Sequence, residues 1–266
     1  MITLRLDAMP ELPVARAGVH EVSAQPVSRV TVLSMLRRLA LTDRLPDLEW
    51  ERTQDWLIAG DQRVRVAMNA SSGGIRYNLR PLAEEQGQSI TSSEERLEEI
   101  ARDFLDRLGR PAEPMTLDRI THLRAQTSSP DGELSEVATL DAGLIFRRTV
   151  DDLPVVGPGG LAMVRVGTDD VVVGGREVWR PIVQSGPPLD LLRPDNAVDL
   201  LRVRLESRGL DGDARVRTAV FGYEERGIEE RQLRLEPCYA FLIEFYGDTA
   251  DYKTVEVISA LPPSVA

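Results

Sequence analysis

The sequence predicts an α+β fold made of repeated units, each with one helix packed on a curled antiparallel sheet. A helical pattern followed by short strand patterns occurs three times, over residues 28–82, 92–183 and 194–261. Two of these rounds end on similar strings, Arg-Tyr-Asn-Leu-Arg-Pro at 76–81 and Arg-Glu-Val-Trp-Arg-Pro at 176–181. We therefore expect an internal repeat with an N-terminal unit at 1–88, a central unit at 89–190 and a C-terminal unit at 191–266. The alternative is a single α+β domain with evenly spaced helices.

Each predicted helix has its own start and stop signals. Ser28 can cap the first helix, whose apolar residues follow at mostly helical spacing. Ser92 or Ser93 can cap the second and clearest helix, which Gly109 ends. Pro194 begins a third helix that runs to about Ser207. The chain before Ser28 has weak order signals, apart from a possible short edge strand at 17–22.

The strand patterns are densest in the middle of the chain and near its end. Residues 146–181 predict a strand, a tight Gly-Pro corner, a second strand, a short turn and a third strand. Pro154 fixes φ there, and Gly157, Gly159 and Gly160 permit a sharp reversal. A phosphate-binding loop would need a helix after these glycines, whereas a β-like run follows. Residues 239–246 alternate so that one face of a central strand is strongly apolar.

Composition excludes several classes of function. The 266 residues carry a net charge of −11, which argues against unaided binding to nucleic acid or to anionic lipid. Lys253 is the only lysine, an arginine bias typical of a GC-rich, bacterial genome. No apolar run reaches the ~18–20 residues of a membrane span, and the N-terminus lacks a signal-peptide pattern. The compartment is left open: the protein is extracytoplasmic if a signal or anchor has been removed, and cytoplasmic otherwise.

The corner at residues 146–160, Phe-Arg-Arg-Thr-Val-Asp-Asp-Leu-Pro-Val-Val-Gly-Pro-Gly-Gly, resembles the signature strand pair of PepSY-like domains. It is also similar to the prodomain module of thermolysin and fungalysin peptidases. The three-round layout is similar to YycH/YycI-type extracytoplasmic regulatory proteins. The resemblance covers residues 93–183 and implies a cystatin-like or PepSY-like α+β fold and a regulatory, protein-binding role. The chain differs in having no HExxH zinc motif.

Few residues have a pattern that indicates catalysis. The histidines, His20 and His122, have no orienting carboxylate nearby in the sequence, and no GxSxG elbow occurs. Cys238, the only cysteine, is expected to be a buried structural thiol. The carboxylate doublets are expected to be solvated turns, a weak adventitious cation site being the alternative; they lie at 151–152, 169–170, 224–225 and 229–230. We expect no catalytic residue, no cofactor and no metal site.

Aromatic and arginine residues gather at the two similar strings. One interpretation is a core in which arginine side chains lie over buried aromatic rings. The other is a groove for a ligand or partner, lined by Trp179, Arg176, Arg180, Tyr77 and Arg80. The strands at 63–68 and 215–223 could also accept a partner strand at an exposed edge, or carry arginines that protect that edge.

These observations favour a non-enzymatic regulatory module that contacts a protein partner, such as a membrane sensor or a peptidase. A small-molecule binder or enzyme with a pocket under the sheet is the second reading. A peptidase inhibitor or detached prodomain is the third. The partner and the oligomeric state are left open.

Overall fold

The computed structural model describes residues 2–41, 48–61, 64–79, 89–109, 114–129, 131–210, 212–246 and 252–262. Its three α-helices lie where the sequence predicts them: α1 at Arg29–Arg38, α2 at Glu94–Leu108 and α3 at Pro194–Ser207. Ser28 and Ser93 accept hydrogen bonds from the backbone N–H groups of Thr31 and Arg96, as helix caps do. Gly109 ends α2 at φ 74°, a left-handed conformation that glycine adopts without strain.

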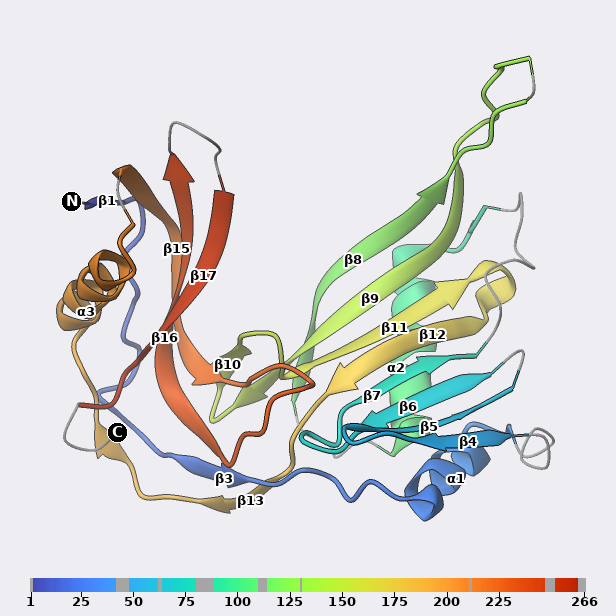
Figure 1. The fold of residues 1–266 in the computed structure, drawn as a ribbon, viewed down its shortest axis with the longest axis horizontal. Helices are drawn as coiled ribbons and strands as arrows, with labels where there is room; N and C mark the ends of the chain where they lie inside the picture. The colour runs from blue at the N-terminus through green and yellow to red at the C-terminus, as the bar shows by residue number, and fades with distance from the viewer. Residues whose placement is uncertain are drawn as a thin grey trace.

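One mixed sheet of fifteen strands dominates the described part of the chain (Figure 1). Its central path runs β13-β3-β16-β15-β10-β9-β11-β12-β7-β6-β5-β4; in addition β1 pairs with β15, β17 with β16 and β8 with β9. A separate two-stranded sheet joins β14 to β2. The strands are β1 Ile2–Leu6, β2 Arg16–Ala17, β3 His20–Val22, β4 Glu49–Arg52, β5 Trp56–Gly60, β6 Arg65–Asn69, β7 Ile75–Asn78, β8 Met115–Ala125, β9 Ala138–Val150, β10 Leu153–Val156, β11 Leu161–Gly167, β12 Val172–Val178, β13 Ile182–Ser185, β14 Leu189–Asp190, β15 Gly212–Glu224, β16 Arg234–Tyr246 and β17 Tyr252–Ser259.

The predicted fold class is wrong in its organisation. The chain is 48% strand and 18% helix, so it is not an α+β repeat of cystatin-like or PepSY-like units with a helix on each sheet. The internal repeat is also wrong, because the strings at 76–81 and 176–181 contribute neighbouring strands of one sheet. In that sheet Arg76 lies directly opposite Arg176, across the β7–β12 ladder. The two similar strings are therefore neighbouring strands of one sheet and not copies of a repeated unit.

Two hydrophobic cores divide the molecule into a first and a second lobe. In the first lobe, α1 and α2 pack on one face of the strands from β9 through β11, β12 and β7 to β4. In the second lobe, α3 packs with β1, β3, β10, β15, β16 and β17. Figure 1 shows the lobes splayed apart, with α3 outside the second lobe and α2 behind the strands of the first. The other face of the first-lobe strands carries no helix among the described residues.

A buried ion cluster joins the lobes. Glu225, just after β15, lies with Oε2 3.2 Å from Nη1 of Arg148 in β9, and with Oε1 3.3 Å from Nη1 of Arg180. All three side chains are fully buried. Arg180 also donates to the carbonyl oxygens of Arg226, Gly227 and Glu230 at 2.6–3.0 Å. Burial raises the pKa of the Glu225 carboxyl, and Arg148 and Arg180 oppose that rise.

The glycine-proline corner forms the other half of this junction, between β10 and β11 as predicted. Gly159 donates its N–H to the carbonyl of Glu225 at 2.9 Å. A Cβ on Gly159 would lie 2.3 Å from the carbonyl oxygen of Arg226, so only glycine allows this approach. Gly157 and Gly160 have φ of 95° and 62°. The corner is thus a structural contact between the lobes.

Pairing between distant parts of the chain changes two further expectations. The predicted weakly ordered N-terminus supplies β1, which pairs in parallel with β15, and β3, which pairs with β13 and β16. The strands predicted as exposed edges, at 63–68 and 215–223, are interior, because β6 lies between β5 and β7, and β15 pairs with β16 on one side and with β1 and β10 on the other. The boundaries 1–88, 89–190 and 191–266 stay a prediction.

Candidate functional site

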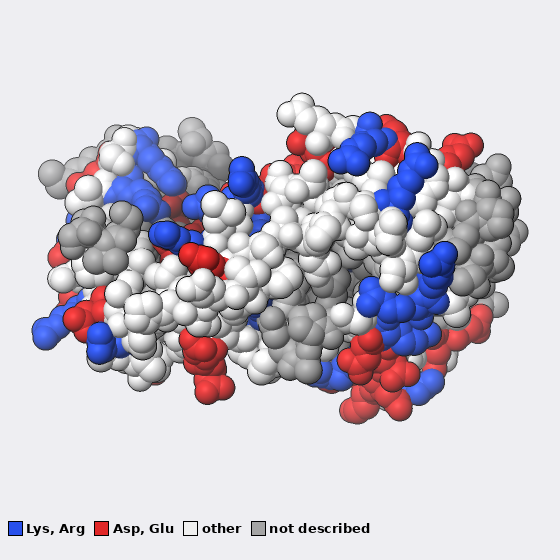
Figure 2. Space-filling view, turned by 90° about the horizontal axis from the view of Figure 1, so that it is seen from below, with Lys and Arg blue, Asp and Glu red and all other residues white. Residues whose placement is uncertain are grey.

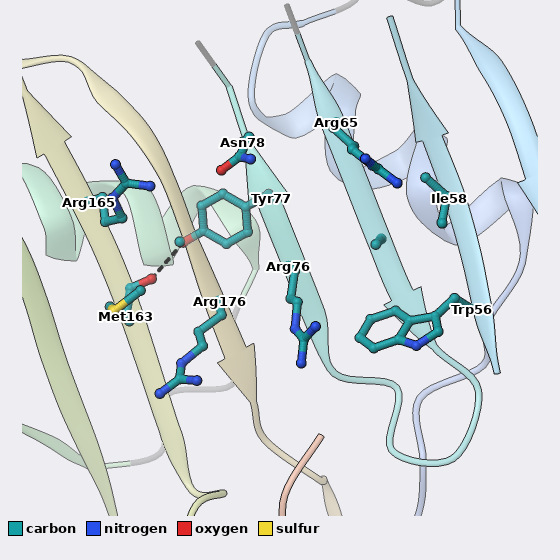
Figure 3. A pocket seen from close by; sticks show the side chains of 11 residues that line it. Trp56, Ile58, Arg65, Arg76, Tyr77, Asn78, Met163, Arg165 and Arg176 are labelled. Atoms are coloured by element: carbon teal, nitrogen blue, oxygen red, sulfur yellow. Dashed lines mark hydrogen bonds between the residues drawn. The ribbon is translucent and has the colours of Figure 1, made fainter. Parts of the chain in front are cut away.

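The uncovered face of the first-lobe sheet holds a hollow of about 490 Å³ (Figure 3). It spans β5, β6, β7, β12 and β11, and the helices lie behind the sheet in this view. The side chains that line it include four arginines, Arg65, Arg76, Arg165 and Arg176. We call this hollow, together with its continuation described below, the open-face groove.

The strand registers explain why the arginines meet on one face. Residues directly opposite each other in a ladder point to the same side of the sheet. One row across six strands reads Glu51, Ile58, Ala67, Arg76, Arg176 and Met163. The adjacent row reads Glu49, Gly60, Arg65, Asn78, Gly174 and Arg165. Glycine and alanine in the middle of these rows leave the space that forms the hollow.

Only part of the positive charge in the groove is neutralised. Arg165 pairs with the buried carboxylate of Asp141, its Nε lying 3.1 Å from Oδ2. Arg76 lies 3.3 Å from Oε1 of the exposed Glu229, and its guanidinium stacks 4.8 Å from the centre of the Trp56 ring. Within the described chain, Arg65 and Arg176 form no ion pair or side-chain hydrogen bond. The groove therefore has an unbalanced positive charge.

The Arg76–Arg176 pair is unfavourable for folding. Like charges directly opposite each other in a β-ladder are destabilising, by roughly 0.2–1 kcal/mol relative to neutral pairs. The described acidic side chains offset only one member, through Glu229 at the surface. An anion bound between the two guanidinium groups would remove the repulsion, since arginine forms two parallel hydrogen bonds with carboxylate or phosphate.

Tyr77 fixes the floor of the groove from the helix side. Its ring packs against Phe104 of α2, with ring centres 5.4 Å apart, and its hydroxyl donates to the carbonyl of Met163 at 3.2 Å, the dashed line in Figure 3. A Cβ on Gly175 would lie 2.4 Å from the Tyr77 hydroxyl oxygen, so the ring occupies the space that a side chain at position 175 would need. This packing holds β7, β12 and β11 in a fixed order beneath the arginines.

The groove continues toward the edge strand β4, where the charge of its lining changes from positive to negative. A second hollow of about 570 Å³ shares Ile58 and Arg65 with the first. Its lining includes three acidic residues, Glu49, Glu51 and Asp61. Asp61 accepts a hydrogen bond from the N–H of Val64 at 2.6 Å. Glu49 and Glu51 form no ion pair within the part of the chain that the structure describes. The open-face groove is thus basic at one end and acidic at the other.

The five residues of the predicted groove lie in different places. Arg176 and Tyr77 line the open-face groove. Trp179 is 4% exposed and Arg180 is fully buried, and both belong to the lobe junction, where Arg148 lies 5.4 Å from the centre of the Trp179 ring. Arg80 lies outside the described residues. Arg65, Arg165, Glu49 and Glu51 were not predicted; the alternation of Arg65 and Ala67 with buried Val66 and Met68 was the available signal.

His20 has partners that the sequence did not reveal. Its Nδ1 lies 3.0 Å from Oγ of Ser185 and its Nε2 lies 3.0 Å from Oδ2 of Asp151. In serine hydrolases the hydroxyl meets Nε2 and the carboxylate meets Nδ1, the reverse of this arrangement. The Nε2–Asp151 contact also lacks hydrogen-bond geometry, and the His20 ring is 2% exposed. The contacts fit a structural link between β3, β13 and the β9–β10 turn.

The other candidates have structural roles. Cys238 is a buried free thiol, as predicted, and burial raises its pKa. Asp151, Asp152, Asp169 and Asp170 have φ between 50° and 62°, a conformation tolerated by aspartate in turns. Within the described ranges, no group of three or more His, Cys, Asp or Glu side chains could hold a metal ion.

Charges of both signs are interspersed on the face that Figure 2 shows. Figure 2 shows one face, on which clusters of Lys and Arg lie beside clusters of Asp and Glu. A single-sign face of the kind that nucleic acid requires is absent from this view. No helix in the described ranges is long and apolar enough to cross a membrane.

Comparisons with known proteins bear on the fold alone. No family model matches the chain, and no curated protein matches it. Among solved structures, the chain is similar to an uncharacterized protein from Eubacterium rectale ATCC 33656. The two are 9% identical, the match covers 97% of this chain and 88% of that one, and the TM-score is 0.54. A likeness at this identity shows a shared fold, and the resemblance to PepSY-like and YycH/YycI-type proteins stays a prediction.

Proposed function

We propose that this chain is a non-enzymatic binding protein that contacts an acidic segment of a protein partner through the basic end of the open-face groove. The observation that carries the proposal is a pair of guanidinium groups, Arg65 and Arg176, that have no acidic partner among the described residues and lie beside the partly neutralised Arg76 and Arg165. Arg165 neutralises the buried Asp141 and Arg76 meets Glu229, but no acidic partner among the described residues accounts for the charge of Arg65 or Arg176.

The chemistry of this basic end supports binding over catalysis. Nucleophilic and general acid–base mechanisms need a nucleophile and a base within hydrogen-bond reach. The side chains around the 490 Å³ hollow are arginine, asparagine, tryptophan, isoleucine, alanine, methionine and tyrosine, and the tyrosine hydroxyl is engaged with Met163. The overall charge of −11 repels polyanions at long range, so binding would depend on local contacts with these arginines.

The test measures binding of a labelled ten-residue polyglutamate peptide by fluorescence anisotropy at low salt. The wild-type chain should bind it, and Arg76→Glu/Arg176→Glu should weaken binding by at least about tenfold, since two attractive contacts become repulsive. Arg124→Glu/Arg231→Glu changes the same charge at exposed positions outside the groove and should keep the affinity. Equal losses in both variants, or no binding by the wild type, would refute the proposal.

A small anionic molecule is the second candidate ligand. The hollow of about 490 Å³ falls within the range typical of small-molecule sites, ~300–1,000 Å³. Calorimetric titration with citrate separates the two: a small-molecule site would bind citrate more tightly than polyglutamate. The peptidase-inhibitor reading stays a prediction without support from the described residues.

A further inference from the structure

The open-face groove is a continuous path with opposite charges at its ends. The two hollows share Ile58 and Arg65, so a ligand can pass from one to the other without leaving the sheet face. Both rows of side chains across the six strands begin with a glutamate on β4, Glu51 in one and Glu49 in the other. The first row then reaches Arg76 on β7 and Arg176 on β12, and the second reaches Arg65 on β6 and Arg165 on β11.

The length of this path fits an extended polypeptide. Neighbouring strands lie about 4.8 Å apart, so the five intervals from β4 to β11 span about 24 Å. An extended chain covers about 3.3 Å per residue, and about seven residues would therefore cross the groove. Glu51 and the Arg76–Arg176 pair are separated by three to four intervals, roughly 14–19 Å. A small ligand such as citrate could contact only one end.

The middle of the path is suited to small or apolar side chains. Between the charged ends, the first row has Ile58 and Ala67 as its floor. In the second row Gly60 is followed at once by Arg65, where the basic end begins. Trp56 lines the basic hollow beneath Arg76 and offers an aromatic surface. A segment with charges in its middle would place them over this apolar floor, whereas one with charges at its ends would place them beside opposite charges.

We propose that the open-face groove binds a segment of another protein about seven residues long, extended across the strands, with acidic residues at one end and basic residues at the other. The acidic end lies over Arg76, Arg165 and Arg176, and the basic end lies over Glu49 and Glu51. This inference rests on the proposed function and adds the charge order and the orientation of the ligand. The short uncharged stretch between the two ends lies over Ile58 and Ala67.

The experiment compares peptides of identical composition. One has two glutamates, a Gly-Ala-Gly spacer and two lysines, seven residues in all; it is made in both chain directions. The other has the same residues with glutamate and lysine alternating. Anisotropy at low salt should show that a block peptide binds at least about tenfold more tightly than the alternating peptide, an effect that 0.5 M salt largely screens. Equal affinities would overturn the proposal.

Variants of the acidic end separate this inference from the proposed function. Glu49→Lys/Glu51→Lys should weaken the block peptide by about tenfold and strengthen polyglutamate, because the groove would then be basic throughout. Glu133→Lys/Glu206→Lys makes the same charge change at exposed positions elsewhere and should do neither. If the lysine variant does not fold, judged by circular dichroism, Glu49→Gln/Glu51→Gln should still lower block-peptide affinity.

Each result has one meaning. If the wild type binds polyglutamate and the arginine variant does not, but the glutamate variants leave the block peptide unaffected, the proposed function stands and this inference fails. If the purified chain forms a dimer in sedimentation velocity that both groove variants abolish, the occupant is a second copy, which would also overturn the inference. Loss of dimerisation only in the control variants would not support that occupant.

Discussion

Arginine has opposite roles in two regions of this molecule. At the lobe junction, Arg148 and Arg180 are fully buried, share Glu225, and donate to backbone carbonyls. In the open-face groove, Arg65 and Arg176 are exposed and have no acidic partner within the described residues. A buried guanidinium without an acidic partner costs several kcal/mol, so the ion pairs of the junction must be formed in the free protein. The exposed groove arginines do not need an internal acidic partner for the protein to fold, so their charge is available to a ligand.

Position in the sheet, not residue type, determines whether an arginine is buried and paired or exposed. Arg176 and Arg180 are four residues apart on the same stretch of chain, yet of the two only Arg180 meets a carboxylate within the part of the chain that the structure describes. The difference follows from the end of β12 at Val178, after which the chain enters the space between the lobes.

Replacing the buried arginine should cost far more stability than replacing the exposed one. Arg180→Met removes one of two charges that compensate Glu225 and the guanidinium donor to the carbonyls of Arg226, Gly227 and Glu230. The Gly227 carbonyl keeps the N–H of Glu230 at 3.2 Å as a donor. We expect the free energy of unfolding to fall by about 3–5 kcal/mol. Arg176→Met should change it by less than about 0.5 kcal/mol, or raise it slightly by removing the repulsion with Arg76.

Urea unfolding at pH 7, followed by circular dichroism, measures both variants. If Arg176→Met were as destabilising as Arg180→Met, Arg176 would have a structural partner, and the difference between groove and junction arginines would not hold. A lower polyglutamate affinity of Arg176→Met at an unchanged urea midpoint would support a role of Arg176 in binding and not in stability.

The glycine corner should be the next most sensitive part of the junction. Gly159→Ala would place a Cβ 2.3 Å from the carbonyl oxygen of Arg226, and the backbone on one side must move. A forced shift in a packed interior costs typically about 1–3 kcal/mol. Gly132→Ala is a weaker test of packing, because a Cβ there meets nothing within 4 Å, although its φ of 84° adds some strain. The urea midpoints of the two variants give the comparison, and equal shifts would show that the contact at Gly159 costs no more than the backbone strain at Gly132.

Local signals in the sequence were sufficient for the helices and for the corner. Ser28, Ser93, Gly109 and Pro194 act at the helix ends where they stand, because capping depends on neighbours within a few residues. The alternation in 239–246 likewise lies within β16. These features need no knowledge of distant partners.

The arrangement of the sheet could not be predicted, because it depends on pairing between residues far apart in the chain. Ile2 pairs with Gly212, and Arg76 pairs with Arg176. Similarity between two strings cannot distinguish a repeated unit from two adjacent strands. The same limit applies to the site: Arg180 is buried against Glu225, 45 residues further along, and the ring of Trp179 lies against Arg148 of β9. The charge order of the groove becomes visible only when six strands are placed in register.

Tyr77 belongs both to the buried core of the first lobe, through its ring, and to the floor of the open-face groove, through its hydroxyl. Tyr77→Phe keeps the ring contact with Phe104 and removes the hydrogen bond to Met163. We expect a loss of about 1 kcal/mol in the free energy of unfolding. Polyglutamate affinity should be unchanged, because the hydroxyl faces a backbone carbonyl. A large loss of affinity at unchanged stability would instead mean that the hydroxyl contacts the ligand.

The smallest effect is expected at a surface network that is already complete. Glu244 on β16 accepts hydrogen bonds or ion pairs from Lys253 at 2.6 Å, Tyr246 at 2.7 Å and Arg217 at 2.5 Å, which lower its pKa to about 2. A carboxyl whose folded pKa lies below its unfolded value of 4.5 stabilises the protein above about pH 4.5 and loses that contribution as the pH falls toward 2. Glu244→Gln should therefore lower Tm slightly at pH 6, and the difference from wild type should shrink by pH 3. Glu51→Gln, which removes an unpaired groove carboxylate, should leave Tm at pH 6 unchanged; a drop equal to that of Glu244→Gln would show that the groove is neutralised from within and does not require a ligand.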